Sequence, residues 1–337
     1  MRKIGVMGAG SWGTALANLL SDNGFQVYLW GRREDGIEEM QQQRENMQYL
    51  PGIPLADTVY PTDDIEQAVA DAEMIVMAVP SQAVREVLMK IKPFLGARAY
   101  VLIASKGLEI STGKRLSQVT EEVIGSHIHG LCAVLAGPTH AEEVARKLPS
   151  AAVVAAYLDN TAFAIQDMFM CRYFRVYTNP DVLGVELGSA MKNIFALATG
   201  ILRGLGYGDN SSAALITRGL AEMLRMGKKL GGVSKTFSGL SGLGDLVVTC
   251  TSTYSRNMRA GLLVAQGLQI PQVQEQIGMV VEGISAVQII NRLAEEHKID
   301  MPICSACYSI LFESADLRAA VDRLMLREKK REVEDFI

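Results

Sequence analysis

Short apolar runs alternate with amphipathic stretches through the first half of the chain. The apolar runs are bounded by Gly, Pro or Ser, whereas the stretches at 14–23, 81–91 and 114–124 have helical spacing. Strand, helix and strand in repetition favour parallel strands joined by right-handed crossovers. We therefore predict an α/β doubly wound sheet. Its strands are expected at 3–7, 26–30, 74–79, 100–104, 132–136 and 151–155, with weaker candidates at 59–60 and 175–178.

The pattern changes after Thr178-Asn179-Pro180. From there the chain has the spacing of helices, and Leu246–Val248 is the main strand-like exception. We predict helices at 185–205, 211–230, 258–267, 285–297, 303–311 and 317–327. The sequence thus predicts a dinucleotide-binding domain at 1–180 and an all-helical substrate and catalytic domain at 181–337.

Composition and charge exclude several classes of protein. The 337 residues hold 33 basic and 37 acidic side chains, a net charge of −4, whereas nucleic-acid binders usually carry a basic surplus. No apolar run reaches the roughly 20 residues that span a bilayer, so stable membrane insertion is not expected. Five scattered cysteines give no disulfide framework. We expect a cytoplasmic protein, and its apolar helical half favours a homodimer.

A glycine motif lies between the first strand and the first helix. Gly8, Gly10 and Gly13 of Gly8-Ala9-Gly10-Ser11-Trp12-Gly13 have the spacing G-x-G-x-x-G. Such glycines allow a tight turn, close approach of backbone to a pyrophosphate and close helix–strand packing. The motif predicts binding of a dinucleotide in a Rossmann-type domain. The alternative is a plain glycine turn in a flavodoxin-like domain.

Two arginines follow the second strand, where NAD enzymes tend to carry an acidic residue for the ribose 2′-hydroxyl. Arg32 and Arg33 suit a 2′-phosphate through charge-assisted hydrogen bonds, which favours NADP(H). Stacking of the same guanidiniums on adenine would leave NAD(H) possible, and the remaining alternative is that both are solvated.

Candidate substrate residues follow later strands. Lys106 and the Gly137-Pro138-Thr139 turn come after the expected strands at 100–104 and 132–136. Because ligands bind at the carboxyl ends of parallel strands, we expect Lys106 near the nicotinamide and the substrate. A loop lysine is otherwise usually solvated.

The helix expected at 185–205 carries a narrow polar stripe that contains Glu186, Lys192 and Asn193. The rest of this helix is too apolar to be exposed, and an ammonium buried without a purpose would be costly. Lys192 is therefore a candidate proton donor. The alternative is a structural lysine paired with Glu186 or another acid.

Two segments further along complete the candidate site. A glycine-rich loop ends in Asp245, which could hold the Lys192 ammonium or accept a substrate hydroxyl, or could only cap a helix. Ser255-Arg256-Asn257 offers hydroxyl, guanidinium and amide donors at an expected helix start, a combination that suits a phosphate dianion. Capping is the alternative there too. Cys304 and Cys307 form a lone C-x-x-C that we interpret as core cysteines, and no metal site is indicated.

These residues carry a resemblance over the whole chain. The segments GAGSWGTALA at 8–17, SKGLE at 105–109, LAGPTHAEEVA at 135–145, VELGSAMKNIFALATGI at 185–201, GLGDLVVTCTSTYSRN at 242–257 and VVEG at 280–283 resemble the bacterial-type NAD(P)-dependent glycerol-3-phosphate dehydrogenases. The resemblance implies reduction of dihydroxyacetone phosphate to sn-glycerol 3-phosphate, a precursor of phospholipids.

The resemblance also implies roles for individual residues. Lys192 matches the proton donor and acceptor, with Lys106 and Asp245 beside it in the mechanism. Substrate positions are Lys106, Gly137, Thr139, Lys192, Asp245, Ser255, Arg256 and Asn257, and cofactor positions are Ser11, Trp12, Arg32, Arg33, Lys106, Ala141, Arg256, Val280 and Glu282. The alternatives are a related two-domain hydroxyacid or phosphogluconate-type dehydrogenase and a non-enzymatic NADP sensor, which has no reason to keep both lysines and Asp245.

Overall fold

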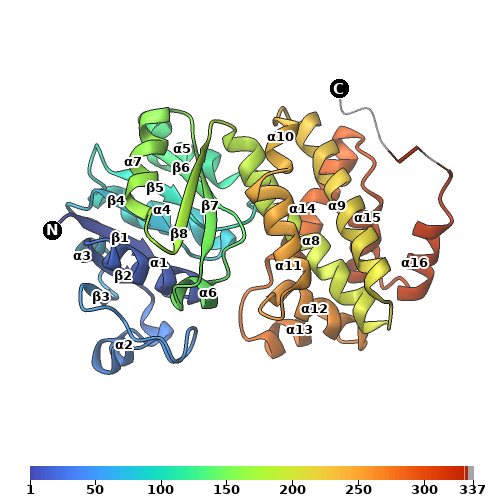
Figure 1. Ribbon diagram of the computed structural model, residues 1–337, viewed down its shortest axis with the longest axis horizontal. Coiled ribbons are helices and arrows are strands. Elements are labelled where there is room, and N and C mark those ends of the chain that lie inside the picture. Colours follow the sequence, from blue (N-terminus) through green and yellow to red (C-terminus); the bar gives the residue numbers. More distant parts are fainter. Residues whose placement is uncertain (330, 333–337) are drawn as a thin grey trace. The chain divides into compact units, whose positions relative to one another are not determined.

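The computed structural model describes residues 1–329 and 331–332, and these form two compact units (Figure 1). The first unit comprises residues 1–106 and 114–182, and the second comprises residues 107–113 and those from 183 onward. Each unit has its own hydrophobic core. Leu108 belongs to the core of the second unit, so the short segment around it folds with residues far along the chain.

The first unit is built on an eight-stranded sheet of order β3-β2-β1-β4-β5-β6-β7-β8. The order reverses direction between β1 and β4, which defines a doubly wound sheet and confirms the predicted fold class. The strands are β1 (Lys3–Met7), β2 (Gln26–Trp30), β3 (Val59–Thr62), β4 (Met74–Met77), β5 (Tyr100–Ile103), β6 (Cys132–Ala136), β7 (Ser150–Ala156) and β8 (Phe174–Asn179).

Helices connect these strands. The glycine motif leads from β1 into α1, whose buried face includes Leu16, Leu19 and Leu20 at helical spacing. The helices of this unit are α1 (Ser11–Asp22), α2 (Ile37–Gln43), α3 (Ile65–Val69), α4 (Val84–Ile91), α5 (Leu116–Ile124), α6 (Ala141–Ala145) and α7 (Asp159–Phe169).

One strand pair differs from the predicted parallel arrangement. β6 and β7 are antiparallel, with Val134 opposite Ala155 and Ala136 opposite Val153. The only helix between them is α6, whose five residues extend about 7.5 Å at 1.5 Å per residue. That is too short to return the chain to the start of β6, so β7 begins near the end of β6 and runs back along it.

The second unit contains helices and no strand among its described residues, so the prediction of an all-helical second half is confirmed. Its helices are α8 (Val182–Gly204), α9 (Asp209–Lys229), α10 (Ser234–Phe237), α11 (Asp245–Thr251), α12 (Arg256–Ala265), α13 (Ile270–Ile277), α14 (Glu282–His297), α15 (Pro302–Phe312) and α16 (Leu317–Met325).

The strand-like interpretation of Leu246–Val248 is wrong, because these residues lie in α11. Leu246, Thr249 and Cys250 are buried while Val247 is exposed, which is the spacing of a helix with one face in the core. Packing of that face overrides the β-propensity of the two valines. Separately, none of the helices in the described part of the chain is long and apolar enough to cross a membrane.

Candidate active site

The glycine loop after β1 has a shape that its residue types dictate. Gly8 has a φ of +115°, and a Cβ there would lie 2.7 Å from the Ala78 carbonyl oxygen. A Cβ on Gly13 would lie 1.8 Å from the Gly8 carbonyl oxygen, whereas one on Gly10 would meet no atom within 4 Å. Gly8 and Gly13 are therefore required by packing, and Gly10 borders open space at the α1 N-terminus. That arrangement fits a pyrophosphate.

Ser11 and Trp12 begin α1 beside this space. The indole Nε1 of Trp12 is buried and has no hydrogen-bond partner among the described residues, which leaves a donor available for a ligand. Asn46 fixes the loop: it is fully buried, and its side-chain amide donates to the Ala9 carbonyl and the Thr14 hydroxyl, both at 2.8 Å. Asn46 was not predicted from the sequence, since no motif marks a single buried asparagine.

The two arginines after β2 differ in their surroundings. The Arg32 guanidinium contacts both neighbouring acids, with Nη2 2.9 Å from an oxygen of Asp35 and Nη1 3.1 Å from an oxygen of Glu34. The hydrogen bonds that the Arg32 guanidinium donates to the Asp35 carboxylate raise the pKa of Arg32. The Arg33 side chain is exposed and has no hydrogen-bond or ion-pair partner in the part of the chain described. Arg33 is thus the arginine open to a new anion.

Lys106, Gly137 and Thr139 lie together at the ends of β5 and β6. The Lys106 ammonium and the Thr139 hydroxyl both donate to the Gly137 carbonyl, at 3.0 and 3.2 Å. Gly137 has a φ of +131°, so this turn favours glycine. Ala141, the first residue of α6, is buried a few residues further on.

In the second unit, Lys192 is only 5% exposed near the middle of α8. Its ammonium forms an ion pair with Asp245, the first residue of α11, and donates to the Thr249 hydroxyl at 2.9 Å. That hydroxyl lies one turn along α11 and donates to the Asp245 carbonyl at 2.5 Å. A buried ammonium is therefore held at one end by a carboxylate and a hydroxyl.

Close helix packing brings these groups together. A Cβ on Gly188 of α8 would lie 2.8 Å from the Ser241 carbonyl oxygen, so this glycine lets the 240–244 turn approach α8. That turn leads directly into Asp245. Asp245 was predicted from the sequence and Thr249 was not, although the spacing of four residues on one helix places the two on the same face.

Ser255, Arg256 and Asn257 form the start of α12. The Ser255 hydroxyl caps the helix by accepting the Met258 N–H at 3.2 Å, and Arg256 and Asn257 begin its first turn. A Cβ on Gly200 of α8 would lie 2.0 Å from the Met258 carbonyl oxygen, so the α8 backbone passes close to this turn. Asn257 is buried, and its Nδ2 donates to the Asn193 side-chain oxygen Oδ1 at 2.8 Å.

Val280 and Glu282 lie where α14 begins. Arg256 Nη1 donates to the Val280 carbonyl at 3.3 Å, and Glu282 is the first residue of the helix. Val280 is 43% exposed, whereas the next residue, Val281, is 1% exposed and belongs to the core. Val280 is therefore the valine of this pair that a ligand can reach.

Buried titratable groups also lie at the start of α15, a helix that contains none of the residues assigned to the candidate site. The Glu222 carboxylate accepts the N–H groups of Ile303 and Cys304 at 2.6 and 3.2 Å, and burial raises its pKa to about 7. Burial also raises the pKa of the Cys307 thiol to about 12 and that of Cys304 well above its usual value. These thiols are protonated and unreactive at neutral pH, as expected of core cysteines.

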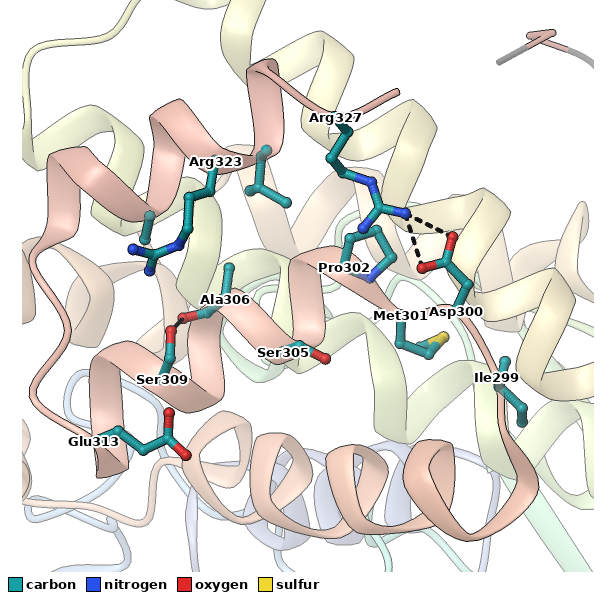
Figure 2. A pocket seen from close by; sticks show the side chains of 12 residues that line it. Ile299, Asp300, Met301, Pro302, Ser305, Ala306, Ser309, Glu313, Arg323 and Arg327 are labelled. Carbon is teal, nitrogen blue, oxygen red and sulfur yellow. Dashed lines mark hydrogen bonds and ion pairs between the residues drawn. The ribbon is translucent and has the colours of Figure 1, made fainter. Parts of the chain in front are cut away.

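A cavity of about 510 Å³ lies between α15 and α16 in the second unit (Figure 2). Asp300 and Arg327 line it and form an ion pair at 2.9 Å, and Arg323, Ser309 and Glu313 line it as well. None of the residues assigned to the candidate site borders this cavity.

Comparisons with known proteins agree with this architecture of a doubly wound sheet followed by a helical unit. Residues 3–162 match the model of the NAD-dependent glycerol-3-phosphate dehydrogenase N-terminus, and residues 181–322 match that of its C-terminus. The chain therefore belongs to the NAD-dependent glycerol-3-phosphate dehydrogenase family.

Individual relatives support this membership. The chain is 56% identical over 337 residues to the glycerol-3-phosphate dehydrogenase [NAD(P)+] of Syntrophomonas wolfei, covering all of this chain and 98% of the relative. It is 48% identical to the Bacillus licheniformis protein of the same name, again over all of this chain and 98% of that one. The crystal structure of glycerol-3-phosphate dehydrogenase from Coxiella burnetii is similar, with a TM-score of 0.92, 39% identity and coverage of 97% and 99% of the two chains.

Proposed function

We propose that this chain is an oxidoreductase that reduces dihydroxyacetone phosphate to sn-glycerol 3-phosphate with NAD(P)H, in a reversible reaction. The observation that carries the proposal is the buried Lys192 ammonium held by Asp245 and Thr249. Burying a charge is costly, and its retention on an otherwise apolar helix is explained by chemistry at that atom. The family to which the chain belongs supports the choice of substrate.

Residues before 180 bind the dinucleotide in this proposal. The glycine loop and the α1 N-terminus would hold the pyrophosphate, since Gly10 leaves open space there. Arg33 would pair with a 2′-phosphate, so we expect NADP(H) to be preferred and NAD(H) to be accepted. When bound, the reduced nicotinamide supplies a hydride to the substrate carbonyl carbon. The contacts before residue 180 come from Gly8, Gly10, Ser11, Trp12, Gly13, Arg32, Arg33, Lys106 and Ala141. Arg256, Val280 and Glu282 are proposed as further cofactor-binding residues.

Residues after 181 bind and orient the substrate. Its phosphate takes hydrogen bonds from Ser255, Arg256 and Asn257, a set that combines a guanidinium with donors at the start of a ten-residue helix. Binding of the phosphate by these three residues fixes the position of the substrate ketone relative to Lys192 and the nicotinamide. Gly137 and Thr139 are further substrate-binding residues in this proposal.

Proton transfer is assigned to Lys192. Its ammonium donates a proton to the alkoxide oxygen as the carbonyl is reduced, and it takes the proton back in the reverse direction. Asp245 keeps the ammonium in place and accepts a hydrogen bond from a substrate hydroxyl. The Lys106 cation stabilises the negative charge that develops on the alkoxide oxygen.

The setting of the enzyme follows from the same proposal. Glycerol 3-phosphate made by this reaction supplies the backbone of phospholipids, and we place the enzyme in the cytoplasm. We also propose a homodimer, which the exposed apolar side chains of Phe312, Met325 and Leu326 support because a second copy would cover them. Analytical ultracentrifugation that found only monomers at micromolar concentration would contradict the dimer.

A direct assay tests the activity. Dihydroxyacetone phosphate is added to the protein with NADPH or NADH, and absorbance is followed at about 340 nm, where the reduced nicotinamide absorbs. We expect oxidation of both cofactors, faster with NADPH. If both cofactors bind and neither is oxidised, the substrate is wrong, and 2-oxo acids are the next to test.

A further inference from the structure

Two buried amides and a backbone N–H form a chain of hydrogen bonds in the second unit. The Gly283 N–H donates to the Asn257 Oδ1, and the Asn257 Nδ2 donates to the Asn193 Oδ1, both at 2.8 Å. Asn193 and Asn257 are 4% and 9% exposed, and Gly283 is buried in the first turn of α14. The chain links α14 to the start of α12 and to the residue that follows Lys192 on α8.

The backbone N–H at Gly283 decides which way both amides point. An N–H can only donate, so the atom of Asn257 that faces it is the oxygen. The Asn257 nitrogen then faces Asn193, whose facing atom must be an acceptor, so the Asn193 oxygen is fixed as well. An amide nitrogen carries two N–H groups, and Asn257 gives only one of them to Asn193. Its second N–H has no acceptor among the described residues.

Position 283 also has no room for a side chain. A Cβ there would lie 2.8 Å from the Asn193 carbonyl oxygen and 2.9 Å from the Asn257 Oδ1. Both distances are shorter than real Cβ contacts, and the first atom belongs to the backbone of α8. The conformation of residue 283 is helical, so glycine is needed here for close approach and not for an unusual φ.

We propose that Gly283 is a positioning residue for substrate binding. Its N–H and its lack of a side chain orient Asn257 so that the second amide N–H points to the substrate phosphate. This inference rests on the proposed function, because it takes Asn257 as a phosphate ligand. It adds a residue that touches neither substrate nor reacting atoms and acts only through Asn257.

The first test is Gly283→Ala in the full-length protein, assayed with dihydroxyacetone phosphate and NADPH. Alanine favours a helix, but its Cβ displaces Asn257, so we expect the KM for dihydroxyacetone phosphate to rise about tenfold. The KM for NADPH should change less than twofold. Gly219→Ala in α9 is the matched control, because its Cβ would lie 2.7 Å from the Phe195 ring of α8, whereas its three nearest atoms include none of Asn193 or Asn257. It should lower the Tm and leave both KM values unchanged.

A double mutant separates positioning from general damage. In an Asn257→Ala background, Gly283→Ala should raise the KM for dihydroxyacetone phosphate by no more than about twofold, because the residue through which it acts is gone. Three results would overturn the inference. They are a tenfold rise in the KM for dihydroxyacetone phosphate in both backgrounds, an unchanged KM for it in the single variant, or equal changes in the KM values for dihydroxyacetone phosphate and NADPH. Wild-type turnover of dihydroxyacetone phosphate is read separately, and its absence would overturn the proposed function itself.

A second pair of variants needs no substrate. Asn193→Asp keeps an acceptor for Asn257, whereas Asn257→Asp cannot donate to Asn193 and places oxygen against oxygen. Each adds one buried carboxylate, so the pair is matched in charge. We expect the lower Tm for Asn257→Asp. The reverse order would show that the amides point the other way and would overturn the assignment of Gly283.

Discussion

The glycine loop of the first unit and the lysine cluster of the second are built by different means. The loop depends on backbone: Gly8 and Gly13 leave no space for a side chain, and Gly10 leaves space for a ligand. The cluster depends on side chains from separate helices, where Lys192 meets Asp245 and Thr249 more than 50 residues later in the chain. Binding and chemistry are therefore separable, and variants of one should spare the other.

Among variants that keep Lys192, the largest effect is expected from Asp245→Asn. The neutral amide can no longer balance the Lys192 ammonium, so kcat with dihydroxyacetone phosphate should fall by about 100-fold, while the Kd for NADPH, from fluorescence titration, stays unchanged. Glu222→Gln is the matched control, since it also neutralises a buried acid of the second unit and should leave kcat alone. A raised Kd for NADPH in Asp245→Asn would contradict the separation of cofactor binding from proton transfer.

Arg256→Ala should act mainly on substrate affinity. Loss of a charged donor to a phosphate predicts a rise of about 10-fold or more in the KM for dihydroxyacetone phosphate. Steady-state kinetics at saturating NADPH would measure it. An unchanged KM would remove Arg256 from the phosphate site.

Gly10→Ala tests the glycine loop and should affect cofactor binding alone. The new Cβ meets no protein atom, so the Tm should hold, but it enters the space assigned to the pyrophosphate and should raise the Kd for NADPH about tenfold. Gly208→Ala is the matched control, because Gly208 also precedes a helix in extended conformation with no atom within 4 Å of its Cβ. Equal NADPH binding by both variants would contradict the assignment of the loop.

The smallest effect concerns stability alone. Burial raises the pKa of Glu222 to about 7, above its unfolded value, although the Ile303 and Cys304 N–H groups and Arg225 oppose this and Asp300 adds to it. The folded state thus binds more protons, and the contribution of Glu222 to stability is fully present below about pH 4.5 and is lost as the pH rises through about 7. We expect the Tm to fall by a few degrees over that range. Glu222→Gln should reduce the dependence of Tm on pH between about 4.5 and 7, measured by differential scanning calorimetry. An unchanged dependence would contradict the assignment of this effect to Glu222.

Much of the fold was predictable because its signals are local. Apolar runs gave the strands, and the glycine spacing indicated the loop, since both depend on neighbours in the chain. The antiparallel β6–β7 pair was missed because strand direction depends on the length of α6 and not on strand composition. Leu246–Val248 was missed because packing in the second unit decides its conformation.

The candidate site divides in the same way. Lys192 and Asp245 were singled out from the sequence, but their ion pair depends on the close approach that Gly188 permits. Asn46 and Thr249 were missed, because a buried polar residue without a motif becomes visible only with its partners. The roles of all these residues remain predictions.

The most direct test of the account is Lys192→Ala, measured for cofactor binding and turnover in the same preparation. We expect NADPH to bind with an unchanged Kd and kcat with dihydroxyacetone phosphate to fall by roughly 10²–10⁴-fold, the contribution of a general acid. Retained turnover in a variant that binds NADPH normally would contradict the assignment of Lys192 as the proton donor.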